Sequence, residues 1–450
     1  MKKLAILGGE PIFEKGEKPE KIKEMLKWPI ITEEDEQAAL EVIRSNNFSN
    51  TDITKQFEKE FAAWIGTNHA VAYCNGTMSL AAAMFAIGLG KGDEIICPTK
   101  TYWASIVSAM TFGAVPVFCN ITDMLTMDPD DIERVISPAT KAIMVVHYIG
   151  YPCDMDRICA IAKKHNLKII EDVSHAQGGL YKGKRLGTFG DVAAMSLMST
   201  KSFSAGELGI VVTNNRRVYE RALAYGHYDR NNATYITESD ELKPYYHMAL
   251  GGVKGRANQL CCAIARVQLK YYDERCAEIR KSMNYFWDLL EGLPGIKPIR
   301  VDESTGSNMA GFYCAAGAYY PDELNGLSVR TFAKAVTEEL GADGRWGVTD
   351  GINLCLHTHN IFRTFDFDNS GKPTRIANAD RDVRLLDEPL DSAARQYCFT
   401  VPWIKKFDKE LIEKIAGAFR NVIENHLELS KSDVADATQG GRWYGFENQQ

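Results

Sequence analysis

Between about residues 70 and 215, short apolar runs alternate with segments whose apolar positions recur at helical spacing. The runs predict strands at 94–97, 115–118, 142–146, 168–171, 192–197 and 209–213. The segments between them, such as 127–136 and 155–165, carry acidic residues in their first turns, which favours helices. This alternation predicts an α/β fold with a mostly parallel sheet, whose ligands bind beyond the carboxyl ends of the strands.

The pattern changes after about residue 260. A long helical run at 258–293 leads into mixed short elements, and a last amphipathic helix is expected near 408–426. We therefore expect an irregular N-terminal arm at 1–30, a large α/β domain at 31–258, a smaller α+β C-terminal domain at 259–430 and a polar tail at 431–450. Thr32 and Asp35 are suitably spaced to open the first helix of the large domain.

Composition narrows the class of protein. The formal net charge of −7 argues against a surface built for nucleic acid or anionic membranes. The apolar part of the first 18 residues is too short for a signal peptide, and the run at 80–90 is too short for a membrane span. The 11 cysteines show neither a CxxC pair nor metal-ligand spacing, which indicates reduced thiols, a cytoplasmic location and no metal site.

Two local features suit a flat, phosphorylated ligand. Gly76 and Thr77, followed by Met78, stand where a helix begins, and the free amides of such a helix start attract phosphate. Tyr102 and Trp103 follow the strand at 94–97 and offer aromatic faces for stacking. Each feature alone has a plainer explanation, since a Gly-Thr pair often only caps a helix and both rings suit a core or an interface.

Two further features carry charge. Asp172 ends the strand at 168–171, with His175 three residues later, and a carboxylate there can pair with a protonated ring nitrogen or simply cap a turn. Lys201 lies in a hydroxyl-rich loop between two strands, where poor solvation would let its amine lose a proton and attack a carbonyl. Together, the four features meet the needs of pyridoxal 5′-phosphate (PLP), which requires a phosphate site, a stacking ring, a carboxylate and a lysine.

The chain also resembles the DegT/DnrJ/EryC1/StrS family of PLP-dependent sugar aminotransferases. The similar segments are NGTMSLAAAM at 75–84, residues 90–121, HYIGYPCDMDRICAIAKKHNLKIIEDVSHAQGG at 147–179 and residues 191–214, within a resemblance that runs from about 28 to 290. Weaker similarity appears near His357 and at 401–419. The resemblance implies a fold-type I PLP-dependent transferase that forms a homodimer with shared active sites.

The resemblance assigns roles to individual residues. It implies that Lys201 carries the cofactor, that Asp172 pairs with the pyridine nitrogen and that His175 approaches the ring oxygen. Tyr102 matches the stacking residue, which leaves Trp103 for the core. Phosphate contacts are implied for the helix start and for one strand end (Gly76, Thr77, Met78 and Ser196).

One position departs from the family pattern. Relatives usually show a GxNxR stretch whose asparagine reaches the phosphate in the neighbouring subunit. In GGVKGRANQL, at 251–260, Lys254 stands at that place and Arg256 follows. A lysine would make a charged contact with the phosphate instead of a neutral one.

The implied activity is transfer of an amino group from glutamate or glutamine to a keto-sugar, nucleotide-linked or free, or to a keto-cyclitol. Three alternatives stay open at this point. A PLP-dependent dehydratase of the same family would carry histidine in place of Lys201, whereas an aromatising enzyme of the amino-hydroxybenzoate type keeps the lysine. A PLP-binding sensor without turnover is the alternative from a different class.

Overall fold

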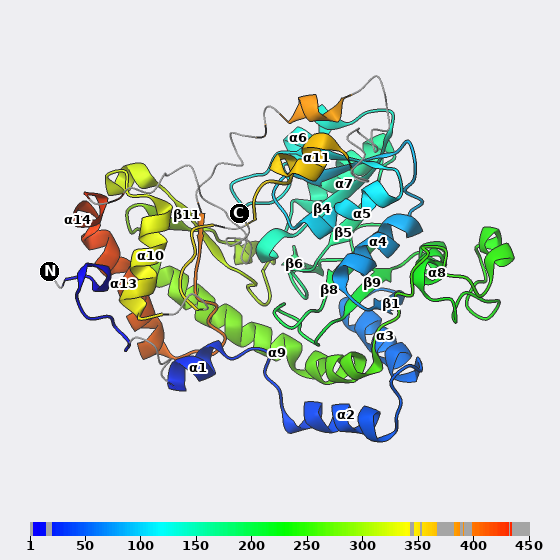
Figure 1. Cartoon of the computed structure of the whole chain (residues 1–450), viewed down its shortest axis with the longest axis horizontal. Coiled ribbons are helices and arrows are strands. Elements are labelled where there is room, and N and C mark those ends of the chain that lie inside the picture. Colours follow the sequence, from blue (N-terminus) through cyan, green and yellow to red (C-terminus); the bar gives the residue numbers. More distant parts are fainter. Residues whose placement is uncertain are drawn as a thin grey trace.

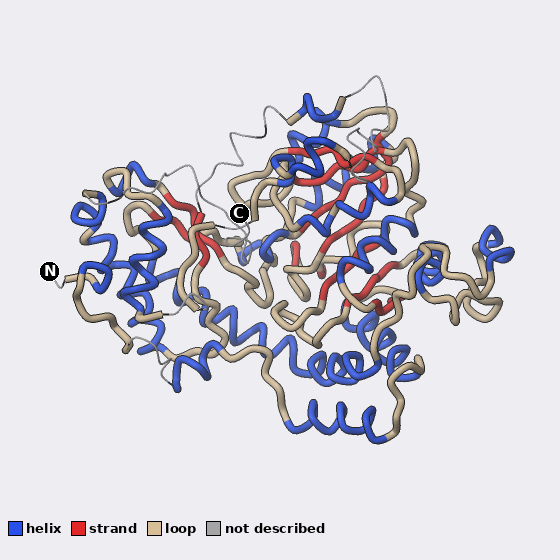
Figure 2. The backbone as a smooth tube through the Cα atoms, in the orientation of Figure 1, coloured by secondary structure: helices blue, strands red, loops and turns tan. Residues whose placement is uncertain are grey.

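Two β-sheets organise the chain, and one long helix connects them. In the computed structural model, the described residues are 3–14, 20–342, 346–351, 353–366, 382–387, 390, 398–431 and 433. Figure 2 shows the strands gathered in two separate groups. Helix α9 (Gln259–Leu290) runs below the larger group and continues to the smaller one (Figure 1).

The main sheet has seven strands in the order β1-β9-β8-β5-β4-β2-β3. Neighbouring strands pair in parallel from β8 to β3, whereas β9 is antiparallel to both β8 and β1. The predicted α/β fold is therefore confirmed. All six predicted strands form, namely β2 (Glu94–Pro98), β3 (Val115–Cys119), β4 (Thr140–Val146), β5 (Lys168–Asp172), β8 (Val192–Ser196) and β9 (Gly209–Thr213).

The sequence reading missed strand β1 (His69–Tyr73), which pairs with β9 at the sheet edge. A two-stranded ribbon, β6 (Leu180–Tyr181) and β7 (Lys184–Arg185), stands apart from both sheets. Its strands are too short to show an alternating pattern in the sequence.

Helix α4 (Gly76–Ala86) packs on β8 and β9 and against α8 (Arg216–Gly226). It is apolar on all sides and rich in alanine, as suits a helix buried between layers. Helix α2 (Glu33–Arg44) packs on α9 below the sheet (Figure 1). The remaining helices of this part are α3 (Asp52–Ile65), α5 (Val107–Thr111), α6 (Pro129–Val135) and α7 (Met155–His165), with the 3-10 helices η2 (Trp103–Ser105), η3 (Tyr148–Gly150) and η4 (Asp240–Tyr245).

The smaller sheet is antiparallel, in the order β10 (Ile296–Pro298), β11 (Ala316–Tyr319), β12 (Cys398–Thr400). Helices α10 (Val329–Leu340) and α13 (Lys409–Glu424) pack together beside it, and α13 confirms the helix expected near 408–426. Three short elements complete this part: η5 (Glu303–Thr305), η6 (Pro321–Leu324) and α14 (His426–Ser430). Three others, η7 (Leu356–Thr358), α11 (Asn360–Thr364) and η8 (Val383–Leu386), lie instead beside β2, β3 and α6 of the main sheet (Figure 1). The predicted domain boundaries stay predictions.

Within the expected N-terminal arm, the described residues 3–14 and 20–30 form two helices. These are η1 (Ala5–Leu7) and α1 (Glu20–Leu26), and η1 packs on α10. The backbone N–H of Ala5 donates to the buried carboxylate of Glu339 at 2.9 Å, which the sequence pattern could not reveal. Of the predicted tail, only Lys431 and Asp433 belong to the described residues.

None of the described helices is long and apolar enough to cross a membrane.

Candidate active site

A cavity of about 750 Å³ opens at the carboxyl ends of β4, β5 and β8 and at the start of α4. Val146, Asp172 and Ser196 mark the three strand ends, and Gly76 marks the helix start. Residues of the smaller part line the opposite wall. The site therefore lies where ligands of parallel α/β sheets bind, beyond the strand ends.

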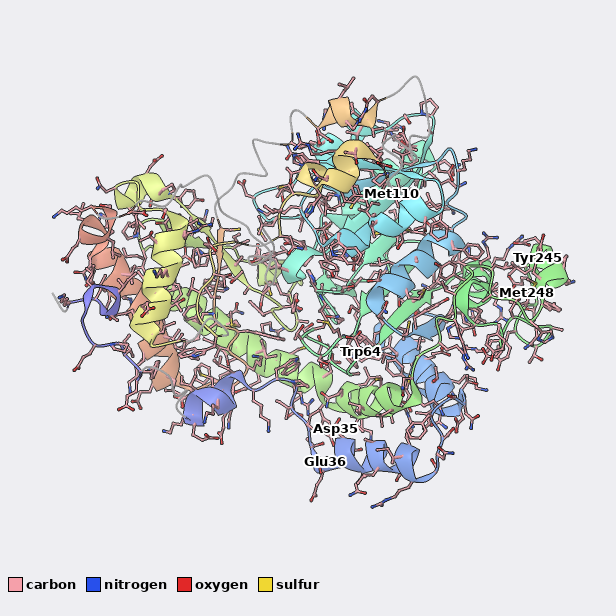
Figure 3. All side chains as sticks on the ribbon, in the orientation of Figure 1. Asp35, Glu36, Trp64, Met110, Tyr245 and Met248 are labelled. Carbon is pink, nitrogen blue, oxygen red and sulfur yellow. The ribbon has the colours of Figure 1, made fainter. Side chains whose placement is uncertain are left out.

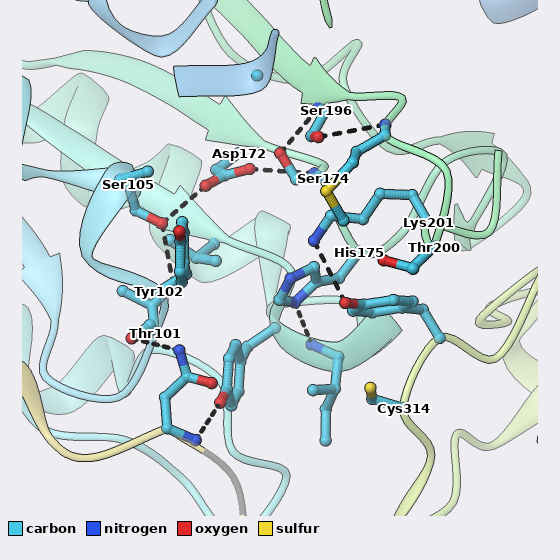
Figure 4. A pocket seen from close by; sticks show the side chains of 18 of the residues that line it. Thr101, Tyr102, Ser105, Asp172, Ser174, His175, Ser196, Thr200, Lys201 and Cys314 are labelled. Carbon is cyan, nitrogen blue, oxygen red and sulfur yellow. Dashed lines mark hydrogen bonds between the residues drawn. The ribbon is translucent and has the colours of Figure 1, made fainter. Parts of the chain in front are cut away.

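Asp172 ends β5, is only 4% exposed and has both carboxylate oxygens occupied. The Ser105 hydroxyl donates to one oxygen at 2.7 Å, and the backbone N–H of Ser174 donates to the other at 3.0 Å. Thr101 lies behind Ser105, with 3.0 Å between the two hydroxyl oxygens. These contacts fix one orientation of the carboxylate (Figure 4).

Lys201 lies on the loop that follows β8 and lines the same cavity. Burial lowers the pKa of its amine from the ordinary value near 10.5 to about 8, although the nearby negative charge of Asp172 opposes the shift. The amine lies 3.5 Å from the hydroxyl of Tyr313 and 4.5 Å from the centre of that ring. A substantial share of the amine is therefore neutral near pH 8.

His175 lies beside Lys201 (Figure 4). Its Nδ1 accepts the backbone N–H of Ile149 at 3.1 Å, which leaves the ring proton of the neutral form on Nε2. Burial, and then the positive charge of Lys201, hold the pKa of His175 well below its usual range. The side chain is thus a neutral hydrogen-bond donor on the cavity wall.

The start of α4 approaches the end of β8 very closely. A Cβ atom at Gly76 would lie 2.5 Å from Cβ of Ser196, so a larger residue would force the two elements apart. Gly76, Thr77 and Ser196 line the cavity, whereas Met78 uses its N–H for the cap formed by Asn75, at 2.9 Å. The first-turn amides of Gly76 and Thr77 precede any intrahelical acceptor, as an anion site requires.

Two adjacent aromatic residues, Tyr102 and Trp103, follow β2, and only the first lies where the prediction places it. Tyr102 lines the cavity, as expected. Trp103 was assigned to the core, and this was wrong, because its side chain is 38% exposed. The two rings are in contact, with centroids 4.9 Å apart.

Lys254 is exposed and does not belong to the described lining of the cavity. Its amine lies 5.6 Å from the centre of the Tyr228 ring, and Arg256 lies over the same ring at 5.4 Å. Arg256 also forms an ion pair with Asp229 at 3.3 Å. The contact of Lys254 with a phosphate in a partner subunit stays a prediction.

The sequence reading missed the residues of the opposite wall: Tyr313, Cys314, Thr349, Gly351, Asn353 and Thr400. The hydroxyl oxygens of Thr349 and Thr400 lie 2.5 Å apart, and the Asn353 amide donates to the carbonyl of Thr101 at 3.4 Å. Tyr148, on the first wall, follows β4 and could have been found by the strand-end argument that identified Asp172. Of the others, Thr400 ends the three-residue strand β12, which is too short to show an alternating pattern, and the rest come from irregular segments.

The comparisons with known proteins agree with this geometry. The model of the DegT/DnrJ/EryC1/StrS aminotransferase family matches residues 29–330. GDP-perosamine synthase of Escherichia coli O157:H7 is 36% identical over 248 residues, which are 55% of this chain and 65% of that enzyme, just under two thirds of its length. The L-glutamine:2-deoxy-scyllo-inosose aminotransferase of Micromonospora echinospora is 29% identical over 438 residues, 95% of this chain and 99% of that one.

Among solved structures, the aminotransferase from Psychrobacter cryohalolentis is similar with a TM-score of 0.75 and 27% identity. That match covers 89% of this chain and 99% of the other.

Proposed function

The chain belongs to the DegT/DnrJ/EryC1/StrS aminotransferase family, and from this premise we propose that it is a PLP-dependent aminotransferase. The donor is glutamate or glutamine, and the acceptor is a keto-sugar or a keto-cyclitol. The observation that carries the proposal is the partly neutral amine of Lys201, placed in one cavity with the carboxylate of Asp172.

The residues of the cavity fit the cofactor. Lys201 would hold the aldehyde carbon and Asp172 the pyridine nitrogen, with His175 at the ring oxygen and Tyr102 against the ring face. The phosphate would lie at the close approach of α4 and β8, where Gly76 leaves space that a Cβ atom would fill. When bound, PLP supplies a protonated ring that takes up the electron pair released at the carbon bearing the amino group.

The protein's own groups account for the proton movements. Because its pKa is about 8, the amine of Lys201, once free, would be able to take a proton from the substrate carbon and deliver it to the cofactor carbon that the lysine had held. Asp172 cannot turn away, since Ser105 and Ser174 hold both of its oxygens. His175 stays neutral and donates from Nε2, so it stabilises a nearby oxygen without adding a second cation.

The opposite wall suits a polyhydroxylated acceptor. Thr349, Asn353 and Thr400 offer hydroxyl and amide groups, and the hydroxyl of Tyr148 accepts the backbone N–H of Asn353 at 3.3 Å. Such neutral groups pair with sugar or cyclitol hydroxyls at little desolvation cost. The relatives named as a perosamine synthase and an inosose aminotransferase support both acceptor classes.

The active unit is proposed to be a homodimer in which the exposed Lys254 of one subunit reaches the phosphate site of the other. Its exposure in the single chain and the aromatic contact with Tyr228 support this role. The 11 cysteines are all free, which supports the reducing cytoplasm as the compartment.

The two half-reactions test the proposal separately. Glutamate or glutamine should discharge the yellow colour of the PLP-loaded protein, and a keto-sugar or keto-cyclitol should then restore it, with the nitrogen found in the product. Ammonia or dehydrated product without transferred nitrogen would point to the dehydratase or aromatising alternative. A protein whose colour no amino donor changes, but which binds a polyol tightly, would be a sensor.

A further inference from the structure

Trp28, in the N-terminal segment, contacts the backbone of Lys201. Its indole N–H donates to the carbonyl oxygen of Lys201 at 2.8 Å, although 173 positions separate the two residues. Trp28 is not among the described lining residues of the cavity. The contact therefore acts on the main chain of the lysine and not on anything the cavity holds.

The other end of Lys201 meets the same group of aromatic residues. Tyr313 lies against the amine, and its ring meets the ring of Trp403 edge to face at 6.1 Å between centroids. Trp403 in turn packs on Trp28, with centroids 5.4 Å apart, and its indole N–H donates to the carbonyl of Gly311 at 2.8 Å. We call these three residues the aromatic bracket: Trp28, Trp403 and Tyr313. Trp28 contacts the main chain of Lys201, Tyr313 contacts its amine, and Trp403 packs against both rings.

Both sides of Trp28 are anchored. On one side, the backbone N–H of Lys405 donates to the carbonyl of Met25 at 3.0 Å, and its amine donates to the carbonyl of Leu26 at 2.7 Å. On the other side, the Gln268 amide, from α9, donates to the carbonyl of Ile30 at 3.1 Å and to Asp35 at 2.7 Å. Figure 3 labels Asp35 at the start of α2, below α9. The indole therefore has a fixed place from which to hold the lysine loop.

We propose that Trp28 and Trp403 are positioning residues for Lys201, which hold its main chain and keep water away from its amine. The inference rests on the proposed function, because that function makes Lys201 the reactive residue. The experiment that tests it does not depend on that function. Three segments far apart in the sequence must meet to form the bracket. Folding of the N-terminal segment onto the smaller part therefore prepares the reactive lysine of the large sheet.

The test follows the titration of Lys201 in the full-length chain, freed of any bound cofactor. An amine-reactive acylating reagent labels only the neutral amine, and peptide mass spectrometry measures the rate at Lys201 across pH. In the unchanged protein the rate should rise with a midpoint near pH 8. Reagent access changes the plateau of this curve, whereas the protonation equilibrium sets its midpoint, so the two effects separate.

Trp28→Phe removes the indole N–H and retains an aromatic ring beside Trp403. Water should then reach the amine and move the midpoint upward, and a shift of one pH unit lowers the labelling rate at pH 8 by about fivefold. Trp403→Phe should shift the midpoint in the same direction. Trp346→Phe is the matched control, since Trp346 also joins the N-terminal segment to the smaller part, through Phe13 at 6.2 Å, but is not among the described residues that line the cavity of Lys201.

Unchanged midpoints in both bracket variants would overturn the proposal, and so would an equal shift in the Trp346 control, which would indicate general loosening. If Trp28→Phe does not fold, Trp403→Phe decides by itself. Because no cofactor or substrate takes part, the result can be interpreted even if the protein proves not to be an aminotransferase.

Discussion

The two walls of the cavity differ in charge and in support. The wall formed by the main sheet carries Lys201, Asp172 and His175. Each of these side chains has a polar partner within 3.5 Å. The described residues of the opposite wall are all uncharged: Tyr313, Cys314, Thr349, Gly351, Asn353 and Thr400. Burial raises the pKa of Cys314, so its thiol stays neutral as well.

The two walls also differ in how firmly strand pairing holds their backbone. Asp172 ends a strand that pairs on both sides, with β4 and β8. Thr349 meets the smaller sheet through one isolated bridge, to Thr400. Groups that move protons need fixed geometry, whereas a wall that selects among acceptors can lie on irregular segments. This difference indicates that changes on the first wall alter rate and that changes on the second alter acceptor affinity.

The largest effect is expected for Lys201→Ala. It removes the group that carries the cofactor and moves the proton, so both half-reactions should slow by about 10³-fold or more. Stopped-flow absorbance of the PLP-loaded protein measures each half-reaction. Lys184→Ala, on the ribbon, is the control and should keep normal rates. Residual turnover within tenfold of the unchanged protein would remove Lys201 from the mechanism.

Two neighbours on β5 give the next contrast, since Asp172 faces the cavity and Glu171 does not line it. Asp172→Asn should slow the donor half-reaction on the order of 100-fold, because the neutral amide no longer favours a protonated ring nitrogen. Stability should change little. Half-reaction rates and thermal melting, measured on the same samples, check both statements.

Glu171→Gln should show the opposite behaviour. The Glu171 carboxylate is completely buried and accepts from His147 at 3.1 Å and from the backbone N–H groups of Gly187, Phe189 and Gly190. Breaking a buried pair of this kind costs about 3 kcal/mol of the free energy of unfolding. The half-reaction rates of the folded fraction should stay within a few-fold. If Glu171→Gln slowed the half-reactions as much as Asp172→Asn does, Glu171 would not be a purely structural residue.

The first wall could largely be predicted from the sequence, and the second could not. Asp172 and Lys201 follow apolar runs that predict strands, Ser196 lies near the end of one, and the ends of neighbouring parallel strands meet at one edge. Thr349 and Asn353 belong to segments without periodicity, and Thr400 ends a strand of only three residues, so long-range packing alone brings them to the cavity. Trp28 was missed for the same reason. Trp103 was misassigned because a sequence does not reveal which of two adjacent aromatic residues faces inward.

The second wall should respond in acceptor affinity. Thr349→Val and Thr400→Val remove hydroxyls while keeping the shape of the side chain, so the KM for the acceptor should rise by about tenfold. The donor half-reaction should be unchanged, and steady-state kinetics with varied acceptor will show this. Thr358→Val removes an exposed hydroxyl outside the cavity and serves as the control. If the rate of the donor half-reaction also fell about tenfold, the second wall would not act on acceptor binding alone.

The smallest expected effect tests how finely the first wall is adjusted. Ser105→Ala removes the 2.7 Å hydrogen bond to Asp172 but leaves the one from the backbone N–H of Ser174, so the carboxylate keeps one of its two constraints. A hydrogen bond to a charged group contributes about 1 to 2 kcal/mol, and part of this should appear as a loss of about fivefold in the donor half-reaction. Ser108→Ala, in the adjacent helix α5, is the control because Ser108 does not line the cavity. Thr101→Val should reproduce part of the loss, since its hydroxyl lies 3.0 Å from that of Ser105 and limits how the latter can turn. If Ser105→Ala keeps the full rate, the backbone contact alone orients Asp172, and the hydroxyl pair only fills space beside it.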